Sequence, residues 1–360
     1  MRFEVTNALD AIEQRLSTDP LVTGAVVDLA EAVRLPGLDV GRPANLLRLG
    51  VLIDGLSRQF ADSGVALYGV AERGLLSDPD LTSNERMVLR RWSDDGLVEI
   101  IPAGMSALDR VCEVGLALDQ PVLTAAQLRG FPGAWMTPLP VEGAVSLLPA
   151  GSPPRRPATV GGVLSRLWRC PEPGCPSFDP NRSPSQPPPQ LSADGVPGCP
   201  RHAERLTDVG PRPYAVPAAV RIDGVVRSRF ALHAGRPVSI GRAPDGPDGV
   251  GIAEYLDERA GRWVSRSHLR LELADDTVVA TDLSTNGCVL LARPDPAAPP
   301  RRSKLPAGQP VSLGEWDAVE LHEHVEVFRA DRMVSVPVEA EPGSVMVDAP
   351  TIALRLPRTR

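Results

Sequence analysis

Aromatic residues are scarce in this sequence: Phe, Trp and Tyr make up only 4% of its 360 residues. Long hydrophobic runs are absent too, because stretches such as Gly24–Val27 fall far short of the ~18 apolar residues that a membrane-spanning helix needs. The chain also begins without the basic and then apolar pattern of a secretion signal. We therefore expect a cytoplasmic protein without a membrane partner.

Cysteine is rare as well, with five residues, and in an intracellular protein these predict metal ligands or buried thiols before disulfides. The 45 acidic residues outnumber the 38 basic ones, and the formal charge of −7 argues against broad nonspecific binding to nucleic acid. Proline and glycine are abundant by contrast, with 39 and 32 residues. This composition predicts long connectors between compact parts.

Patterns of hydrophobic residues divide the chain. In residues 1–135, short apolar runs such as Val98–Ile101 alternate with stretches such as Ala44–Phe60, in which apolar residues recur at helical spacing. This alternation predicts βαβ units and a parallel sheet. After about residue 218, short strands separated by turn residues predict an all-β sandwich. The expected organisation is a multidomain α/β plus all-β protein: an α/β domain at 1–135, a linker at 136–165, a small segment at 166–212, a β-sandwich at 213–335 and a Pro-rich tail at 336–360.

Three short motifs occur in order in the expected sandwich: Gly241-Arg242, Ser265-Arg266-Ser267-His268 and Asn286-Gly287. Each lies at the end of a predicted strand or in the following loop, so all three can converge at one end of the sandwich. A guanidinium, a hydroxyl and an amide suit a phosphate that carries about −1.5 to −2 charges. Arg242 can donate a charge-assisted bond to it, Ser265 a neutral bond, and Asn286 can bind a peptide backbone.

This set resembles the forkhead-associated (FHA) domain, whose signature is GR, SxxH and NG, over about residues 215–330. The resemblance implies a sandwich that binds phosphothreonine peptides. It assigns the phosphate and peptide contacts to Arg242, Ser265, Arg266 and Asn286, and the shaping of the loops to Gly241, His268 and Gly287. The Pro-rich stretch Pro294–Arg302 departs from the family's usual tight turn.

The alternative is a sandwich of the same fold that no longer binds a ligand, because GR and NG by themselves are common turn sequences. The expected partner is a threonine-phosphorylated protein or peptide. The chain's own tail is a second candidate partner, because it carries Ser335, Thr351 and Thr359.

Four further residues have the spacing of metal ligands. Cys170 and Cys175 are followed by Cys199 and His202, and three thiolates with an imidazole can hold a tetrahedral Zn²⁺. The set is similar to a zinc ribbon, and a segment so poor in apolar residues would need the metal to fold. The alternative is a disordered linker with incidental cysteines. Cys112 and Cys288 lie in apolar surroundings and are expected to be small core residues.

Acidic residues follow the predicted strands of the first domain. Asp28 and Glu72 come directly after strands, and Asp109 opens a helix after another strand. Because the carboxyl ends of parallel strands share one edge, these acids could line one crevice and hold Mg²⁺ or Mn²⁺.

The order of these elements resembles a PIN-like nuclease domain over about residues 20–132. Two departures count against activity: Ala125-Ala126 stands where the family usually has an Asn-Asp pair, and Glu31 stands where it usually has an Asn. We therefore expect a noncatalytic domain, and whether the protein is an enzyme stays open.

The function that the sequence favours is a phosphothreonine-binding adaptor or signalling protein. The rival is a metal-dependent RNA nuclease regulated by the FHA domain. A third possibility is a zinc ribbon that touches nucleic acid through Arg201 and Arg205, so RNA stays open as a partner.

Overall fold

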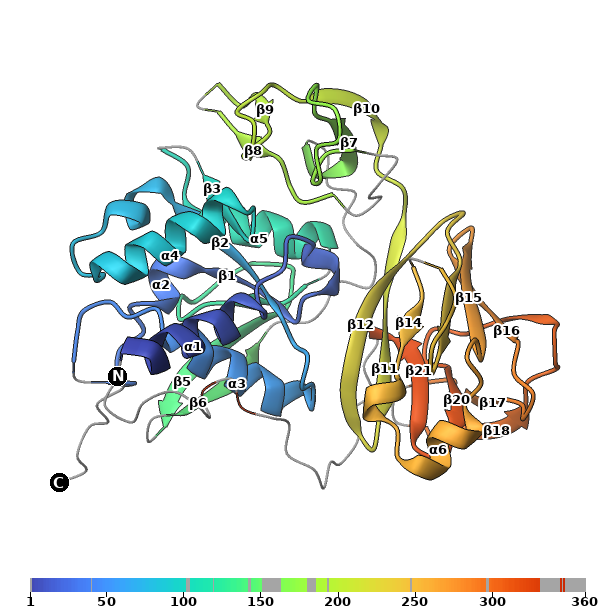
Figure 1. Cartoon of the computed structure of the whole chain (residues 1–360). Helices are drawn as coiled ribbons and strands as arrows, with labels where there is room; N and C mark the ends of the chain where they lie inside the picture. The colour runs from blue at the N-terminus through green and yellow to red at the C-terminus, as the bar shows by residue number, and fades with distance from the viewer. Residues whose placement is uncertain are drawn as a thin grey trace. The chain divides into compact units, whose positions relative to one another are not determined.

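The structure, a computed structural model, describes most of the chain. The described residues are 2–39, 41–101, 104–118, 120–141, 144–150, 163–179, 186–192, 194–246, 248–295, 298–330, Ser344 and Met346. They form two compact units (Figure 1). Unit 1 comprises residues 1–59, 65–212 and 343–360, and unit 2 comprises residues 60–64 and 213–342. The tail residues Ser335, Thr351 and Thr359, and Pro102 and Ala103 before Asp109, lie outside the described residues.

A sheet with the strand order β3-β2-β1-β4-β5-β6 runs through the described part of unit 1. Its strands are β1 (Ala25–Asp28), β2 (Leu67–Glu72), β3 (Val98–Ile101), β4 (Val122–Leu123), β5 (Trp135–Val141) and β6 (Ala144–Ala150). Neighbours from β3 to β5 pair in parallel, and β6 pairs antiparallel with β5. The central strands β1 and β2 are buried along almost their whole length, so neither alternates between buried and exposed residues.

Helices cover both faces of this sheet, with α5 on one face and α3 on the other (Figure 1). The helices are α1 (Arg2–Glu13), α2 (Leu29–Ala32), α3 (Arg48–Phe60), α4 (Ser83–Asp94) and α5 (Ala107–Leu118). Val111 and Val114 of α5 belong to one buried cluster with Val26 of β1. A capping box, in which Thr82 and Glu85 bond each other's backbone amides, fixes the start of α4.

The hairpin of β5 and β6 differs from the linker that the sequence predicts for residues 136–165. Strand β5 contains Pro138 and Pro140, and proline cannot donate a ladder hydrogen bond. In the structure β5 pairs with β4 only at Trp135 and Met136. Both prolines therefore lie where that side of β5 has no partner strand, which is where a sheet tolerates proline.

The small segment that contains the predicted metal ligands belongs to unit 1. It begins with a short 3-10 turn (Val163–Ser165) and contains two antiparallel pairs: β7 (Arg166–Arg169) with β10 (Thr207–Pro211), and β8 (Gln190–Leu191) with β9 (Pro197–Gly198). Its buried apolar cluster is small: Trp168, Cys170, Cys175, Phe178, Cys199 and Leu206. The Gln190 side-chain amide donates to the carbonyl of Ile100 (3.1 Å), which ties β8 to the edge strand β3.

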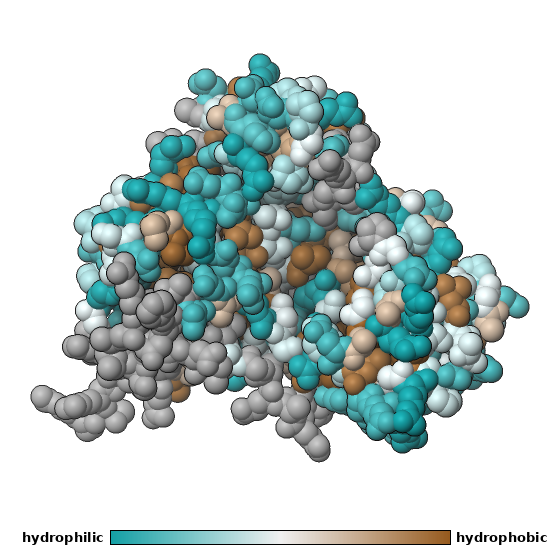
Figure 2. All heavy atoms as spheres, viewed as in Figure 1, coloured by the Kyte–Doolittle hydropathy of each residue, from teal (hydrophilic) through white to brown (hydrophobic). Residues whose placement is uncertain are grey.

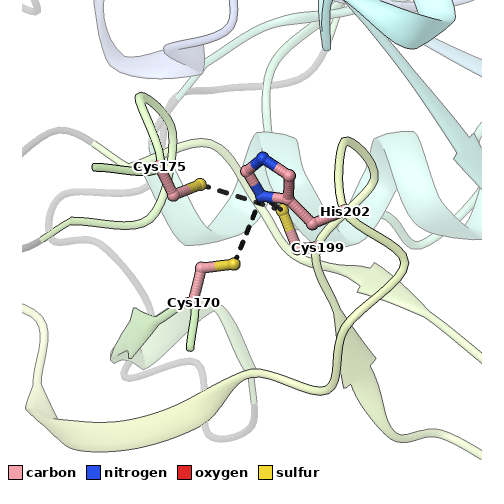
Figure 3. Close-up of side chains that lie close together, drawn as sticks. All are labelled: Cys170, Cys175, Cys199 and His202. Atoms are coloured by element: carbon pink, nitrogen blue, oxygen red, sulfur yellow. Dashed lines mark hydrogen bonds between the residues drawn. The ribbon is translucent and has the colours of Figure 1, made fainter. Parts of the chain in front are cut away.

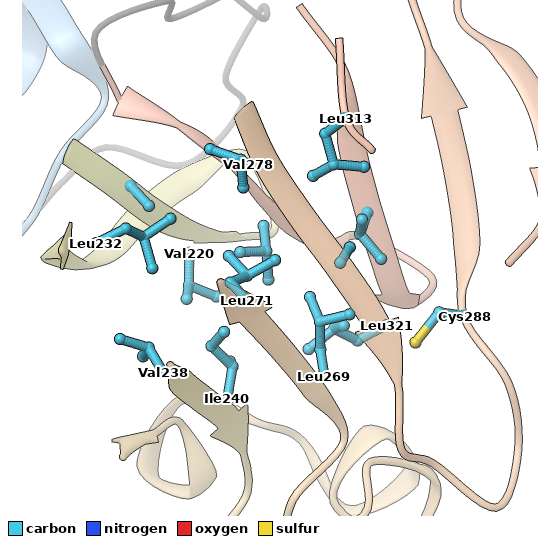
Figure 4. Close-up of a cluster of buried hydrophobic side chains, with 14 of the residues drawn as sticks. Val220, Leu232, Val238, Ile240, Leu269, Leu271, Val278, Cys288, Leu313 and Leu321 are labelled. Atoms are coloured by element: carbon cyan, nitrogen blue, oxygen red, sulfur yellow. The ribbon is translucent and has the colours of Figure 1, made fainter. Parts of the chain in front are cut away.

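Unit 2 is a β-sandwich. One sheet has the order β12-β11-β21-β20-β17-β18 and the other β14-β13-β15-β16-β19. The strands are β11 (Ala215–Ile222), β12 (Val225–His233), β13 (Val238–Gly241), β14 (Val250–Gly251), β15 (Leu269–Ala274), β16 (Thr277–Asp282), β17 (Val289–Ala292), β18 (Arg301–Lys304), β19 (Pro310–Ser312), β20 (Ala318–His322) and β21 (Val325–Arg329). A single core fills the space between the sheets, with Val220 and Leu321 from the first and Leu271 from the second (Figure 4).

Two details of unit 2 differ from the sequence prediction. The sequence predicts short strands here, and the last apolar run, residues 318–328, is not one strand but the hairpin of β20 and β21, with His324 in the turn at a φ of 64°. A short helix, α6 (Glu258–Trp263), stands between β14 and β15, and its first turn is capped by the Asp257 side chain. Cys288 is 1% exposed, as the sequence predicts, whereas Cys112 is only half-buried.

On the face of the molecule drawn in Figure 2, hydrophobic residues form scattered patches among hydrophilic ones. No helix in the described part of the chain combines the length and the apolar character of a membrane span.

Candidate functional site

The first loop of the candidate site follows strand β13. The backbone amide of Arg242 donates to the carbonyl of Ser265 (3.1 Å), and that of Ala243 donates to the carbonyl of Arg266 (3.2 Å). A Cβ atom on Gly241 would overlap both of these carbonyl oxygens. Only glycine therefore lets the end of β13 approach the Ser265–His268 loop so closely.

The second contact joins that loop to the loop after β16. The backbone amide of Thr285 donates to the Ser265 hydroxyl oxygen (3.3 Å), and the two side-chain hydroxyls lie 3.4 Å apart. The Asn286 side-chain amide donates to the carbonyl of Trp263 (2.7 Å). The structure thus brings the loops of Arg242, Ser265 and Asn286 to one end of the sandwich, which we call the loop rim.

The two arginines that the sequence assigns to the site differ in their side-chain partners. Arg266 forms an ion pair with Asp245 (2.9 Å), and both side chains are exposed. Arg242 is exposed, and its guanidinium forms no hydrogen bond or ion pair with another described residue. Arg242 is therefore the arginine of the rim that can bind an anion without first losing a partner.

His268 supports the rim from below. It is fully buried, and its Nδ1 accepts the backbone N–H of Ser265 (2.9 Å). Burial lowers the pKa of His268, against the opposing effect of the Asp282 carboxylate. Because Nδ1 accepts this hydrogen bond, the neutral ring carries its proton on Nε2, and His268 positions the backbone of Ser265.

Asp282 shapes the third loop. Its carboxylate accepts from the Ser284 backbone amide (2.8 Å), the Ser284 hydroxyl (2.7 Å) and the backbone amide of Cys288 (3.0 Å). Burial alone would raise the pKa of Asp282, but these bonds hold it below its usual range. Gly287 closes the loop with a φ of +89°, a conformation that favours glycine.

The structure adds one residue that the motif reading did not place. Thr285 presents an exposed hydroxyl beside Ser265, from the position directly before Asn286. The sequence signal was only a hydroxyl residue next to the NG pair, which cannot show which way that hydroxyl points.

The four predicted metal ligands come together in unit 1 (Figure 3). One ligand atom from each of Cys170, Cys175, Cys199 and His202 lies within 4.8 Å of the others. His202 Nδ1 lies 3.4 Å from the Cys170 sulfur and 3.5 Å from the Cys199 sulfur, and the sulfurs of Cys175 and Cys199 are 3.8 Å apart. Burial raises the pKa of the Cys170 thiol to about 12.

These separations fit a tetrahedral metal. Bonds of about 2.3 Å to sulfur and about 2.0–2.1 Å to nitrogen place two sulfurs about 3.8 Å apart and a sulfur and nitrogen about 3.5 Å apart. The observed 3.8, 3.4 and 3.5 Å match these edges closely. The donor set of three thiols and one imidazole can therefore hold a metal ion.

The acidic residues of unit 1 are less concentrated than the sequence predicts. Asp28 ends β1 and Glu72 ends the neighbouring β2. The pKa of Asp28 is raised, chiefly by burial and further by the charges of Glu31 and Glu72. Asp109 is exposed on α5. Among the described residues searched, the acids form no metal-ligand group like that of the cysteines.

The acids at this edge also have structural partners. The Asp28 side chain accepts from the Ala30 backbone amide (2.8 Å) and so caps α2. Glu31 accepts from the Thr124 hydroxyl (2.8 Å) and from the backbone amide of Ala125. Glu31 thus binds the two residues that directly follow β4.

Comparison with known proteins gives structural matches only. No family model and no curated protein matches the chain, whereas 41 chains of solved structures do. FHA domains recur among them. The chain is similar to the FHA domain of human APLF in complex with an XRCC1 bisphospho peptide, with 24% identity, a TM-score of 0.22, and coverage of 31% of this chain and 97% of that one.

Two other FHA domains give similar values. For the CT664 protein of Chlamydia trachomatis the identity is 18% and the TM-score 0.24, over 32% of this chain and 96% of that one. For a hypothetical protein of Arabidopsis thaliana the identity is 21% and the TM-score 0.25, over 36% of this chain and 92% of that one.

Proposed function

We propose that unit 2 is an FHA-type module that binds phosphothreonine peptides at the loop rim. The proposal rests on one observation. Arg242 is exposed, its guanidinium has no partner among the described residues, and its backbone amide is hydrogen-bonded to the carbonyl of Ser265. The Ser265 hydroxyl in turn lies beside the hydroxyl of Thr285. An exposed arginine beside two hydroxyls matches the needs of a phosphate, whose oxygens only accept hydrogen bonds.

The donors of the rim are available in the free protein. The hydroxyls of Ser265 and Thr285 contact each other at 3.4 Å, which is long for a bond between hydroxyls, so a phosphate oxygen can replace that contact. The Asn286 amide nitrogen is used on the Trp263 carbonyl, which leaves its Oδ1 as an acceptor for a peptide N–H. We therefore assign the phosphate to Arg242, Ser265 and Thr285, and the peptide backbone to Asn286.

Arg266 has a secondary role in this proposal. Its ion pair with Asp245 would have to open before it could assist at the phosphate. Because that pair is exposed, its rupture costs about 1 kcal/mol or less. Gly241, His268 and Gly287 shape the rim and do not contact the ligand.

We further propose that Cys170, Cys175, Cys199 and His202 hold a structural Zn²⁺ in a zinc-ribbon-like segment. When bound, the metal would supply cross-links in a segment whose apolar cluster has only six buried members. Four protein ligands leave no open coordination position, so the role is structural. Metal analysis of the purified chain should give about one Zn²⁺ per chain, and a metal-free protein prepared without chelator would refute the assignment.

For unit 1 we propose a PIN-like domain that is not catalytic. The parallel strand order 3-2-1-4-5 supports the resemblance, and the partners of Asp28 and Glu31 support the loss of activity. The chain would then act in the cell as an adaptor that reads a threonine phosphate, on a partner or on its own tail, and links it to unit 1.

A screen of the full chain against a degenerate phosphothreonine peptide library tests the central proposal. We expect selective enrichment of phosphorylated sequences with a defined flanking preference. Equal capture of a matched library in which threonine is unphosphorylated would refute it.

A further inference from the structure

Helix α3 contains a glycine, Gly50, in its interior, where glycine is unfavourable for the helix. A Cβ atom there would overlap the Met346 sulfur and lie 3.0 Å from the Met346 Cγ and 3.3 Å from Ile12 Cδ1. Gly50 is therefore the site of a close approach by a residue almost 300 positions later in the chain.

The second glycine of the helix has an ordinary explanation, which makes the first one informative. A Cβ on Gly55 would lie 3.0 Å from the Val145 carbonyl oxygen, so this glycine admits strand β6 of the sheet. At Gly50 the three nearest atoms to such a Cβ are instead side-chain atoms of Met346 and Ile12.

A polar contact fixes the same tail segment one helical turn further along α3. The Ser344 hydroxyl donates to Asp54 Oδ2 (2.6 Å), and the Met346 backbone amide donates to the same oxygen (3.3 Å) and to the Ser344 hydroxyl oxygen (3.1 Å). Asp54 is only 6% exposed. Because Gly50 and Asp54 are four residues apart, they lie on one face of the helix.

We infer that this face of α3 is a docking site for the chain's own tail, with Met346 in the space above Gly50 and Ser344 on Asp54. The occupant is the part of the tail that carries Ser344 and Met346, the two described residues that contact this face. The inference concerns unit 1 alone and does not depend on peptide binding at the loop rim.

Docking of this kind would be sensitive to charge. A phosphate ester on Ser344 would remove the donated proton and place about −1.5 to −2 charges against the Asp54 carboxylate. Phosphorylation of Ser344 by a serine kinase is therefore expected to release the tail from α3.

Hydrogen exchange at the Met346 amide in the full chain tests the docking. We expect this amide to exchange at least about tenfold more slowly than an unstructured one, because it donates to a carboxylate. Gly50→Ala, Ser344→Ala and Ser344→Glu should each lower that protection. The matched control is Gly261→Ala in α6, where a Cβ meets nothing within 4 Å, and it should leave the protection unchanged.

Ser344→Ala and Ser344→Glu keep the test open if Gly50→Ala fails to fold, because they alter only the tail. Adding the same charge at Ser335 should not release Met346. An unprotected Met346 amide in the native chain, or protection that all three variants leave intact, would overturn the inference. So would protection that disappears on dilution, because the occupant would then be the tail of a second copy.

Discussion

The cysteine-containing segment and the sandwich of unit 2 differ in how many apolar residues each buries. Among the described residues of the segment from Val163 to Pro211, the buried apolar cluster has six members, three of which are cysteines. Among the described residues of unit 2, the core between the sheets has twenty-one buried members. The small cluster buries little apolar surface to offset conformational entropy, so under the proposed Zn²⁺ assignment the metal would contribute much of the segment's stability.

The difference decides what the polar residues of each region are free to do. In the cysteine-containing segment, the ligand atoms of Cys170, Cys175, Cys199 and His202 lie within 4.8 Å of one another, so under the proposed Zn²⁺ assignment all four would be used by the metal. In unit 2 the core alone can hold the sheets together, so Arg242, Thr285 and Asn286 can remain exposed at the loop rim. Residues committed to folding and residues available for binding are thus separated between the two regions.

Metal removal is expected to give the largest difference between the cysteine-containing segment and the sandwich. Chelation, or Cys170→Ser, is expected to unfold the segment from Val163 to Pro211, because metal binding contributes about 10 kcal/mol or more to such folds. Hydrogen exchange should show lost protection in β7 and β10 and unchanged protection in β15 and β16. Cys112→Ser, outside the cluster, is the control. Protection of β7 that survives complete metal removal would show that the apolar cluster suffices.

The next largest effect is expected at Gly241. Gly241→Ala should destabilise unit 2 by about 2–3 kcal/mol, because the added Cβ meets two backbone carbonyls that cannot move freely. Gly251→Ala is a matched control, since Gly251 pairs with Gly241 and a Cβ there would find its nearest neighbour at 3.9 Å. Chemical denaturation measures both variants. Equal stability of the two would mean that the loops do not need this close approach.

Arg242→Ala tests binding without touching the core. We expect a loss of at least about 1.4 kcal/mol in phosphopeptide affinity, which is tenfold, and no loss of stability, because the side chain is exposed. Arg301→Ala removes the same charge from an exposed residue of β18 and serves as the control. Calorimetric titration measures both affinities. An equal loss of phosphopeptide affinity in the two variants would show that only the overall charge matters and that Arg242 makes no specific contact.

A smaller effect is expected from pH. The pKa of His268 is lowered in the folded state, so below the unfolded value of about 6.5 the unfolded chain binds a proton that the folded chain excludes. Unit 2 should therefore lose stability as the pH falls from 7 to 5, and His268→Asn should flatten this dependence. Asp282, whose pKa is lowered, contributes only in more acidic solution. A stability that is constant over this range would contradict a buried neutral imidazole.

The smallest effect is expected from Asp28→Asn. The amide oxygen can still accept the Ala30 N–H, and the repulsion from Glu31 and Glu72 is relieved, so stability should change by no more than about 0.5 kcal/mol. Incubation with Mn²⁺ and labelled single-stranded RNA should show no cleavage by either protein. Cleavage by the native chain that Asp28→Asn abolishes would establish the nuclease and end the noncatalytic assignment.

The sequence predicted what depends on local patterns. Val98–Ile101 was expected as a strand and is β3, and the spacing of Cys170, Cys175, Cys199 and His202 brought four ligand atoms together. These succeed because apolar runs and ligand spacings are properties of neighbouring residues.

Other features depend on register or on distant contacts. Residues 136–165 were predicted as a linker, because the composition cannot show that Pro138 and Pro140 lie beyond the region of β5 that pairs with β4. The direction of the Thr285 hydroxyl and the meeting of Gly50 with Met346 are likewise set by the tertiary structure. Asp28 and Glu72 end neighbouring strands at one sheet edge as expected, whereas Asp109 lies exposed on α5, and the hydrogen bonds that occupy Glu31 could not be foreseen.

The central claim is that an exposed guanidinium and two hydroxyls at the ends of three loops hold a phosphate. The most direct measurement is the affinity of the full chain for one library-selected peptide in its threonine and phosphothreonine forms. We predict binding of the phosphorylated form at least about a hundredfold tighter, a difference of about 2.7 kcal/mol from charge-assisted bonds. Equal affinity for the two forms would contradict the account.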